Sequence, residues 1–170
     1  MQKEIEVKFK LNKLKDIKEK LINLGSYFEK PYKQTTYSFF SKTSIEQGIF
    51  PRIRDEKGEI VLTVKVKTKK QNNYFERNEY SVKIQSLKHG KAVLKALGFN
   101  KIKTFEKVRQ ETEFLNTKIS LDKLYFGDFI EIEGEKKHIE NVINILGLNS
   151  KERITKAYLA LEEEYKKDIS

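Results

Sequence analysis

The chain has 170 residues, of which 38% are hydrophobic and 35% are charged, and its formal net charge is +10. This length and composition are typical of one globular domain, so we predict a single domain over residues 1–170. No apolar run reaches the roughly 18–20 residues that span a bilayer, and the N-terminus carries no apolar signal core, so we expect a cytoplasmic protein without a membrane partner. Since the sequence has no cysteine, disulfides, zinc thiolates and thiol nucleophiles are excluded.

Extended and helical periodicities alternate along the chain. In chain order they predict a strand over residues 3–10, a helix over 12–24, strands over about 35–40, 50–55, 60–67 and 76–84, a helix over 86–97, strands over 103–114, 118–124 and 129–134, a helix over 136–146, and a last helix that begins near Ser150. The first three helices end at Gly25, Gly98 and Gly147, which are good helix stops. A run of strands joined by short turns favours an antiparallel sheet or barrel in an α+β fold over a doubly wound parallel sheet.

The arginines are distributed unevenly. Only five of the 35 basic residues are arginine, and four of these five lie in predicted strands. A guanidinium binds phosphate or carboxylate through two parallel hydrogen bonds, which a lysine ammonium cannot do. The strand arginines Arg52, Arg54, Arg77 and Arg109 therefore indicate an anionic ligand.

Most predicted strands have one apolar and one charged face, as where Glu4, Glu6 and Lys8 alternate with Ile5 and Val7. Taken strand by strand, a half-solvated sheet explains this alternation. The charges are also sorted, however, because acids dominate the first and last strands and bases dominate those between. A barrel that turns its charged faces inward would have an acidic wall for hard cations such as Mg²⁺ or Mn²⁺ and a basic wall for phosphate.

Six short motifs occur in the order found in one known family. They are Glu4-Ile5-Glu6-Val7-Lys8, Arg52-Ile53-Arg54, Leu62-Thr63-Val64-Lys65, Arg77-Asn78-Glu79, Lys107-Val108-Arg109, and Asp122 followed by Gly127-Asp128-Phe129-Ile130-Glu131-Ile132-Glu133. Over roughly residues 2–165 the chain resembles the CYTH family, which comprises class IV adenylate cyclases and thiamine triphosphatases and is also called the triphosphate tunnel metalloenzymes. The resemblance implies one CYTH-like domain: an eight-stranded antiparallel β-barrel, the triphosphate tunnel, with flanking helices and one or two divalent cations.

The same resemblance implies roles for individual residues. The implied metal ligands are Glu4, Glu6, Asp122, Glu131 and Glu133. The implied phosphate contacts are Lys8, Arg52, Arg54, Lys65, Arg77, Lys107 and Arg109, and Glu79 orients the bases beside it. Tyr37 resembles the family tyrosine that holds the lysine of the first motif, so Lys8, Tyr37, Glu4 and Glu6 are the predicted catalytic residues.

Hydrolysis is the reaction that we predict from this resemblance. Water would attack the terminal phosphorus of a metal-bound triphosphate, either inorganic tripolyphosphate or a small organic triphosphate such as thiamine triphosphate or ATP. The alternative is a class IV adenylate cyclase, which makes cyclic AMP and pyrophosphate from ATP. Those cyclases resemble one another in a His-Phe pair upstream of the first motif, and this chain begins three residues before Glu4, which favours hydrolysis.

A non-catalytic module that binds RNA or polyphosphate is a more remote alternative, because the chain is basic and carries aromatic side chains. No RNA-binding motif supports this alternative, and it leaves the acidic residues unexplained, so nucleic acid is not the favoured partner. The sequence also has no phosphate-binding loop of the Walker type. It leaves open whether the protein is a monomer or a homodimer, which metal it prefers, and what the organic part of the substrate is.

Overall fold

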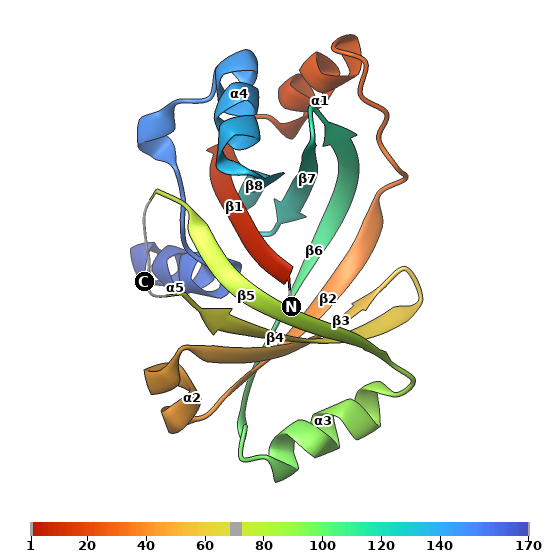
Figure 1. Ribbon diagram of the computed structural model, residues 1–170, viewed down its shortest axis with the longest axis vertical. Coiled ribbons are helices and arrows are strands. Elements are labelled where there is room, and N and C mark those ends of the chain that lie inside the picture. Colours follow the sequence, from red (N-terminus) through yellow and green to blue (C-terminus); the bar gives the residue numbers. More distant parts are fainter. Residues whose placement is uncertain (1, 69–72, 170) are drawn as a thin grey trace. The chain divides into compact units, whose positions relative to one another are not determined.

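The computed structural model describes residues 2–68 and 73–169, which form eight β-strands, five α-helices and one short 3₁₀ helix (Figure 1). The strands are β1 (Gln2–Leu11), β2 (Tyr32–Phe40), β3 (Ile49–Glu56), β4 (Glu59–Lys67), β5 (Phe75–Ile84), β6 (Lys101–Phe114), β7 (Thr117–Leu124) and β8 (Gly127–Gly134). The helices are α1 (Leu14–Asn23), α2 (Lys42–Gln47), α3 (Leu87–Ala96), α4 (Lys136–Leu146), η1 (Ser150–Glu152) and α5 (Tyr158–Asp168).

The strands form a closed barrel in the order β1-β5-β4-β3-β2-β6-β7-β8. This order confirms the predicted α+β fold with an eight-stranded antiparallel barrel and flanking helices. Within the described residues, no helix is both long and apolar enough to cross a lipid bilayer.

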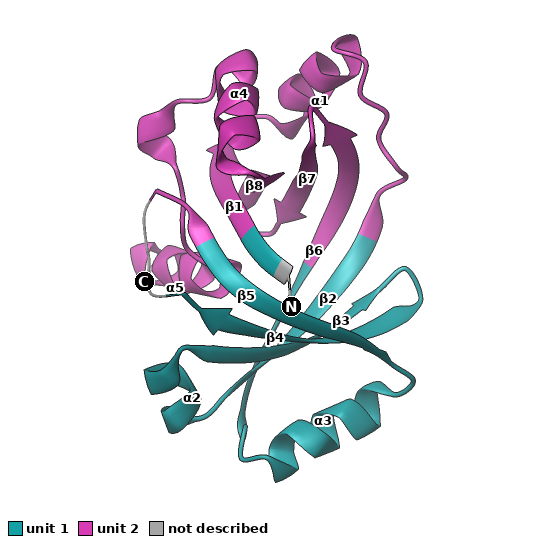
Figure 2. Cartoon of the chain, viewed as in Figure 1, with its two compact units in different colours: residues 1–4, 33–70, 76–106 teal, residues 5–32, 71–75, 107–170 magenta. Residues whose placement is uncertain are grey.

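The chain divides into two compact units, which are coloured separately in Figure 2. Unit 1 comprises residues 1–4, 33–70 and 76–106, and unit 2 comprises residues 5–32, 71–75 and 107–170. Each unit draws residues from several stretches of the chain, so the division does not follow a linker in the sequence. A single domain over residues 1–170 stays a prediction.

Unit 1 contains the antiparallel strands β2, β3, β4 and β5. One face of these strands carries a core of Phe39, Ile53 and Leu94, the last of which belongs to α3. Gly90 lets the backbone of α3 approach this face, because a Cβ at that position would lie 2.5 Å from Ile84 Cδ1 and 2.9 Å from Ile53 Cδ1. The apolar face of unit 1 is therefore the face that a helix covers.

Unit 2 contains strands β7 and β8 and the greater parts of β1 and β6, and helices α1 and α4 pack on β7 and β8 (Figure 1). Apolar side chains of the strands, such as Val7, Ile119 and Ile132, meet Leu21 of α1 and Ile143 of α4 in one buried core. These are the alternate residues of each strand, so their charged neighbours point to the other face. Within each unit, helices therefore pack on the apolar strand faces.

Two helices differ from the sequence analysis. Helix α2, which starts with a capping box between Ser41 and Ser44, is absent from the predicted elements. The prediction of a helix from near Ser150 is wrong, since α5 begins only at Tyr158. Ile154 instead pairs in an extended conformation with Lys8 of β1, and backbone groups committed to this pairing cannot also continue a helix.

Candidate active site

The first charged group lies in unit 1, on the strand face opposite α3. The unit 1 cluster, as we define it, consists of Glu4, Arg52, Arg54, Lys65 and Glu79. Strand register brings Lys65 opposite Glu79, and it also aligns Arg52 with Thr63, two residues before Lys65. Lys65 Nζ donates to Glu4 Oε1 at 2.6 Å and lies 3.2 Å from Glu79 Oε2.

Glu79 is the shared acceptor of the unit 1 cluster. Its carboxylate lies 3.5 Å from Arg52 Nη2, and it accepts a hydrogen bond of 3.0 Å from Ser81 Oγ. Burial pushes the pKa of Glu79 upward, but Arg52, Lys65 and Arg54 outweigh this effect and hold the pKa below its usual value. Glu79 is therefore ionised and lies within ion-pair distance of Arg52, Arg54 and Lys65. Its role in orienting these cations stays a prediction.

Arg54 is the least strongly paired arginine of this cluster. Its nearest ion-pair distances, to Glu56 and to Glu79, are both 4.0 Å. Its buried Nε atom has no hydrogen-bond acceptor among the described residues. A buried donor without an acceptor is energetically unfavourable. An anionic ligand could accept a hydrogen bond from this Nε–H group.

Arg77 lies on the same face of β5 as Glu79, opposite Lys67 of β4. It is buried, and its Nη1 atom donates to the carbonyl oxygen of Glu76 at 2.7 Å. The structure therefore places Arg77 beside the unit 1 cluster along the strand, two residues from Glu79.

The second charged group lies in unit 2, on the strand face opposite α1 and α4. The unit 2 cluster, as we define it, consists of Glu6, Lys8, Lys107, Arg109, Asp122 and Glu131. Strand register aligns Arg109 with Asp122, and Lys8 with Glu131. Glu133 follows Glu131 on the same strand face and is aligned with Glu6.

Asp122 is fully buried at the centre of the unit 2 cluster and accepts hydrogen bonds from three side chains. Arg109 donates to it from Nε and from Nη2, both at 2.6 Å, in the two-pronged geometry of a guanidinium and a carboxylate. Lys107 Nζ donates to Asp122 Oδ2 at 2.9 Å, and Tyr158 Oη donates to the same oxygen at 2.8 Å. Asp122 therefore determines where both cations lie.

Glu131 connects the two ends of the unit 2 cluster. It accepts a short hydrogen bond from Arg109 Nη2, and Lys8 Nζ lies 3.2 Å from its Oε1. Lys8 also donates a short hydrogen bond to Glu6. Burial raises the pKa of Glu131, but Lys8, Arg109 and Lys107 outweigh it and hold the pKa well below its usual value.

The pKa values of the two buried lysines of the unit 2 cluster are shifted in opposite directions. Burial lowers the pKa of Lys8, but Glu131 and Glu6 outweigh burial and raise it above the usual value. Burial also lowers the pKa of Lys107, and Arg109 adds to this effect, so that the pKa is about 8 although Asp122 opposes the shift. Lys8 is therefore a permanent cation, whereas Lys107 can lose its proton in mildly alkaline solution.

Tyr158 belongs to this site, although it lies outside the six sequence motifs. Its hydroxyl group binds Asp122, and its ring centroid lies 5.4 Å from Lys8 Nζ and 4.9 Å from Lys107 Nζ. Burial, together with Glu131 and Asp122, raises the pKa of Tyr158 well above its usual value, so the phenol stays a hydrogen-bond donor. No motif indicated this role, because it depends on where the last helix begins.

Tyr37, in contrast, lies on the apolar face of β2. It is aligned with Ile53 and packs against the core of unit 1, with Lys91 Nζ 3.5 Å from its ring centroid. Its neighbour Thr36 is the residue aligned with Arg54. The structure therefore does not bring Tyr37 to the charged face of unit 1, and its predicted catalytic role is unsupported by its position.

Glu111 is a further carboxylate on the charged face of β6 that the motifs did not indicate. It follows Arg109 by two residues, so it shares the strand face of Arg109. It accepts a hydrogen bond from Tyr32 Oη at 2.7 Å and lies 2.8 Å from Lys118 Nζ. Lys107, Arg109 and Glu111 are alternate residues of one strand, so the period of two could have predicted that Glu111 lies on the charged face.

We expect replacement of Glu111 with glutamine to reduce stability by about 1–2 kcal/mol at pH 7, through the loss of hydrogen bonds to a charged group. Burial alone raises the pKa of Glu111, but Lys118 and Tyr32 lower it to about 2. A lowered pKa in the folded state gives stability that is present above the unfolded pKa and is lost as the pH falls toward 2. The measurement is urea denaturation of both proteins between pH 7 and pH 2.5.

The control for this experiment is Glu113→Gln, which changes an exposed carboxylate on the same strand. We expect this change to alter the free energy of unfolding by less than about 0.5 kcal/mol. A destabilisation by Glu111→Gln that is equal at pH 7 and at pH 2.5 would contradict the assigned ion pair.

The predicted metal ligands have the donor chemistry that Mg²⁺ and Mn²⁺ require, since all are carboxylates. In the structure Glu4 binds Lys65, Glu6 binds Lys8, and Asp122 and Glu131 bind the cations described above. Within residues 2–68 and 73–169 no three acidic or histidine side chains are grouped so that they could hold a metal ion as they stand. The donor set therefore fits a hard cation in its chemistry, and metal binding by these residues stays a prediction.

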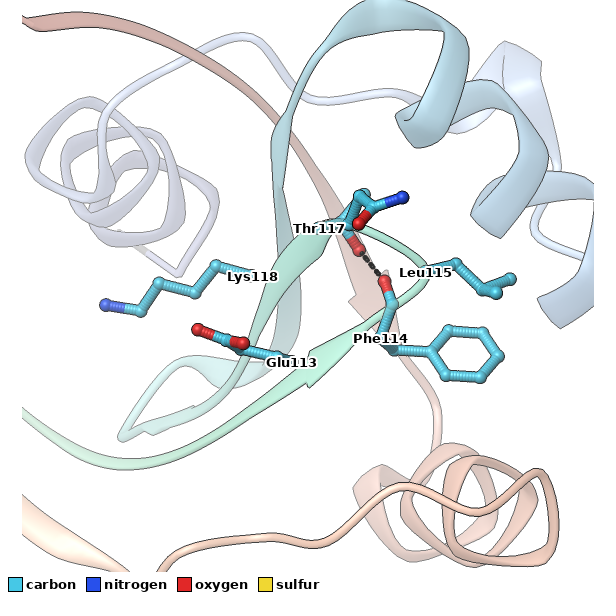
Figure 3. A pocket seen from close by; sticks show the side chains of 6 residues that line it. Glu113, Phe114, Leu115, Thr117 and Lys118 are labelled. Carbon is cyan, nitrogen blue, oxygen red and sulfur yellow. Dashed lines mark hydrogen bonds between the residues drawn. The ribbon is translucent and has the colours of Figure 1, made fainter.

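A surface hollow of about 510 Å³ lies at the turn between β6 and β7, lined by Glu113, Phe114, Leu115, Asn116, Thr117 and Lys118 (Figure 3). The turn places Leu115 and Asn116 at positive φ, as a tight hairpin requires, and Thr117 Oγ1 donates to Phe114 O at 2.6 Å. In Figure 3, Phe114 and Leu115 extend away from the charged pair Glu113 and Lys118. None of the predicted site residues lines this hollow, so we assign it no role.

Known structures share this architecture. The PH1012 protein from Pyrococcus horikoshii OT3 has 28% sequence identity and a TM-score of 0.80, with 93% of this chain and 98% of that chain covered. A candidate adenylate cyclase from Vibrio parahaemolyticus has 16% identity and a TM-score of 0.80, with 95% and 98% covered. A candidate adenylyl cyclase from Hippeastrum, described as having a dominant triphosphatase activity, has 17% identity and a TM-score of 0.60, with 87% and 89% covered.

The identities to the last two proteins are so low that the similarity concerns the fold alone. No curated protein matches the chain. A family model described as the CYTH domain does match residues 2–158, so it spans all eight strands and both charged clusters. The chain therefore belongs to the CYTH family.

Proposed function

We propose that this chain is a divalent-metal-dependent triphosphatase that hydrolyses inorganic tripolyphosphate or a small organic triphosphate. The observation that carries the proposal is the burial of Lys8, Lys107 and Arg109 together with carboxylates on the strand face of unit 2 that lies opposite α1 and α4. Buried ion pairs contribute little to stability, because the desolvation of each ion offsets much of their attraction. A concentration of such pairs on the faces opposite the helices is better explained by a highly charged ligand.

The lysines and arginines of the two clusters would bind the phosphate oxygens. Arg54 supports this role most directly, since its buried Nε has no acceptor in the part of the chain that the structure describes and its carboxylate neighbours there are 4.0 Å away. A guanidinium also fixes the orientation of a phosphate, because it donates two parallel hydrogen bonds. Lys8 would contribute a charge that persists at any physiological pH, since its pKa is raised.

Carboxylates of each unit would supply ligands for divalent cations: Glu4 in unit 1, and Glu6, Asp122, Glu131 and Glu133 in unit 2. When bound, Mg²⁺ or Mn²⁺ neutralises phosphate charge and lowers the pKa of coordinated water. In the structure, lysine and arginine side chains form ion pairs with several of these carboxylates. A phosphate ligand would attract the same lysines and arginines, and their carboxylates would then be available to a cation.

We expect purified protein to release phosphate from tripolyphosphate, thiamine triphosphate or ATP in the presence of Mg²⁺ or Mn²⁺. Excess chelator should abolish this release, because the carboxylates and the substrate phosphates would otherwise repel one another. The measurement is one panel that quantifies phosphate, pyrophosphate and cyclic AMP for each substrate and metal. Adding the metal back should restore activity.

Three other results of this panel would contradict the proposal. Release of cyclic AMP and pyrophosphate from ATP would replace the triphosphatase assignment with that of an adenylate cyclase. Tight binding of polyphosphate or RNA without turnover of any substrate would indicate a binding module. Full turnover in excess chelator would refute the metal dependence.

A further inference from the structure

Lys8 is held by two residues that lie far from it in the sequence. Its backbone N–H donates to Ile154 O at 3.1 Å, and Ile154 N–H donates to Lys8 O at 2.9 Å. Its ammonium group lies 5.1 Å from the ring centroid of Phe75. Ile154 therefore fixes the backbone of Lys8, and Phe75 borders the space that its side chain occupies.

Tyr74 precedes Phe75 in the sequence, and Arg153 precedes Ile154. Both residues bind the carboxylate of Glu140. Tyr74 donates a short hydrogen bond from its hydroxyl group to Glu140 Oε1. Arg153 Nη2 donates to Glu140 Oε2 at 2.6 Å. The guanidinium of Arg153 also lies 5.6 Å from the ring centroid of Tyr74. One carboxylate thus connects two segments of the chain, and each segment contacts Lys8 at its next residue.

Glu140 has a fixed position from which it can hold both segments. It lies on α4, whose neighbouring residues Ile139, Val142 and Ile143 are fully buried in the core of unit 2. The hydrogen bond from Arg153 and that from Tyr74 lower the pKa of Glu140 despite a partial opposing effect of burial. The carboxylate is therefore ionised at neutral pH, and its bond with Arg153 is charge-assisted.

We propose that Glu140 is a positioning residue for Lys8, which it orients through Tyr74 with Phe75 and through Arg153 with Ile154. The consequence for catalysis rests on the proposed function, in which Lys8 binds phosphate. Glu140 itself touches neither Lys8 nor any other member of the unit 2 cluster in the contacts that the structure gives for it. Its effect must therefore pass through the two segments.

Hydrogen exchange followed by NMR tests this proposal without any assay of activity. Glu140→Gln should increase the exchange rates of the Lys8 and Ile154 amides by about tenfold, since a charge-assisted hydrogen bond is lost. The amides of Ile119 and Ile132, which are aligned on β7 and β8, should keep their rates. Glu140→Ala should give at least the same increase, because it removes both contacts even where glutamine retains one.

Glu162→Gln is the matched control. Glu162 accepts a hydrogen bond from a tyrosine, Tyr125 Oη at 2.7 Å, and one from a cation, Lys166 Nζ at 2.8 Å. Its replacement should leave the exchange of Lys8 and Ile154 unchanged. Unchanged exchange at Lys8 and Ile154 in both Glu140 variants would overturn the proposal, and so would an equal increase at Ile119 and Ile132.

A kinetic cycle tests whether Glu140 acts through Lys8. Glu140→Gln should lower kcat/KM for the triphosphate by about 3- to 10-fold in the wild-type background, and Glu140→Asp should restore part of this loss. In a Lys8→Met background the same change should have no further effect, because the two residues act as one unit. Independent, additive losses would overturn the proposal. Absence of triphosphatase activity in the wild-type protein would refute the proposed function only, since the exchange experiment still decides the positioning.

Discussion

Replacement of Asp122 with asparagine is expected to lower the free energy of unfolding by about 3–5 kcal/mol, the usual effect of removing one partner from a buried ion pair. Asp122 is fully buried and accepts hydrogen bonds from Lys107, Arg109 and Tyr158. Asparagine keeps the shape of the side chain but has one acceptor oxygen and directs an NH₂ group at these donors. Two buried cations, Lys107 and Arg109, would then each lose one compensating charge, although Arg109 would keep its hydrogen bond to Glu131.

Urea denaturation at pH 7 measures this effect. Asp55→Asn is the control, because Asp55 is exposed on β3 and its loss should change the free energy of unfolding by less than about 0.5 kcal/mol. Tyr158→Phe removes only one neutral donor to Asp122, so we expect a smaller loss of about 1 kcal/mol. An Asp122→Asn protein as stable as its parent would show that the unit 2 cluster does not depend on this carboxylate.

The alternation of charged and apolar residues within each strand predicted most of the candidate site. In β1 the period of two separates Glu4, Glu6 and Lys8 from Val7 and Phe9, and the structure buries the latter two in the core under α1 and α4. The same period predicts the charged face of β6. Pairing partners, in contrast, are set by register between strands, and no local pattern indicated that Arg109 would lie opposite Asp122.

Two tyrosines show where local patterns fail. The family resemblance predicts a catalytic role for Tyr37, although its parity in β2 puts it with Phe39 on the apolar face. Tyr158 reaches Asp122 because five residues, 153–157, separate η1 from α5 and let Ile154 pair with β1. The spacing of Ile154 and Tyr158 fits a helix equally well, so only the tertiary hydrogen bonds of Ile154 distinguish the two conformations.

Arg54→Lys is expected to reduce kcat/KM for the triphosphate by about 10- to 100-fold while it leaves the melting temperature nearly unchanged. The substitution preserves the positive charge and changes only the geometry of the donors. If Arg54 binds a phosphate through two hydrogen bonds, loss of a charge-assisted bond of about 1.5–3 kcal/mol accounts for a decrease of this size. Stability should change little, because among residues 2–68 and 73–169 the carboxylates paired with Arg54, those of Glu56 and Glu79, lie no closer than 4.0 Å.

Lys57→Arg is the control for this experiment, since Lys57 lies in the turn between β3 and β4, three residues from Arg54. It makes the reverse exchange of side chains at an exposed position, where we expect no change in rate or in melting temperature. Phosphate release and thermal melting measured on both variants separate binding from folding. An Arg54→Lys enzyme as active as its parent would show that a point charge is sufficient at this position, and it would remove the arginine fork from the proposed phosphate site.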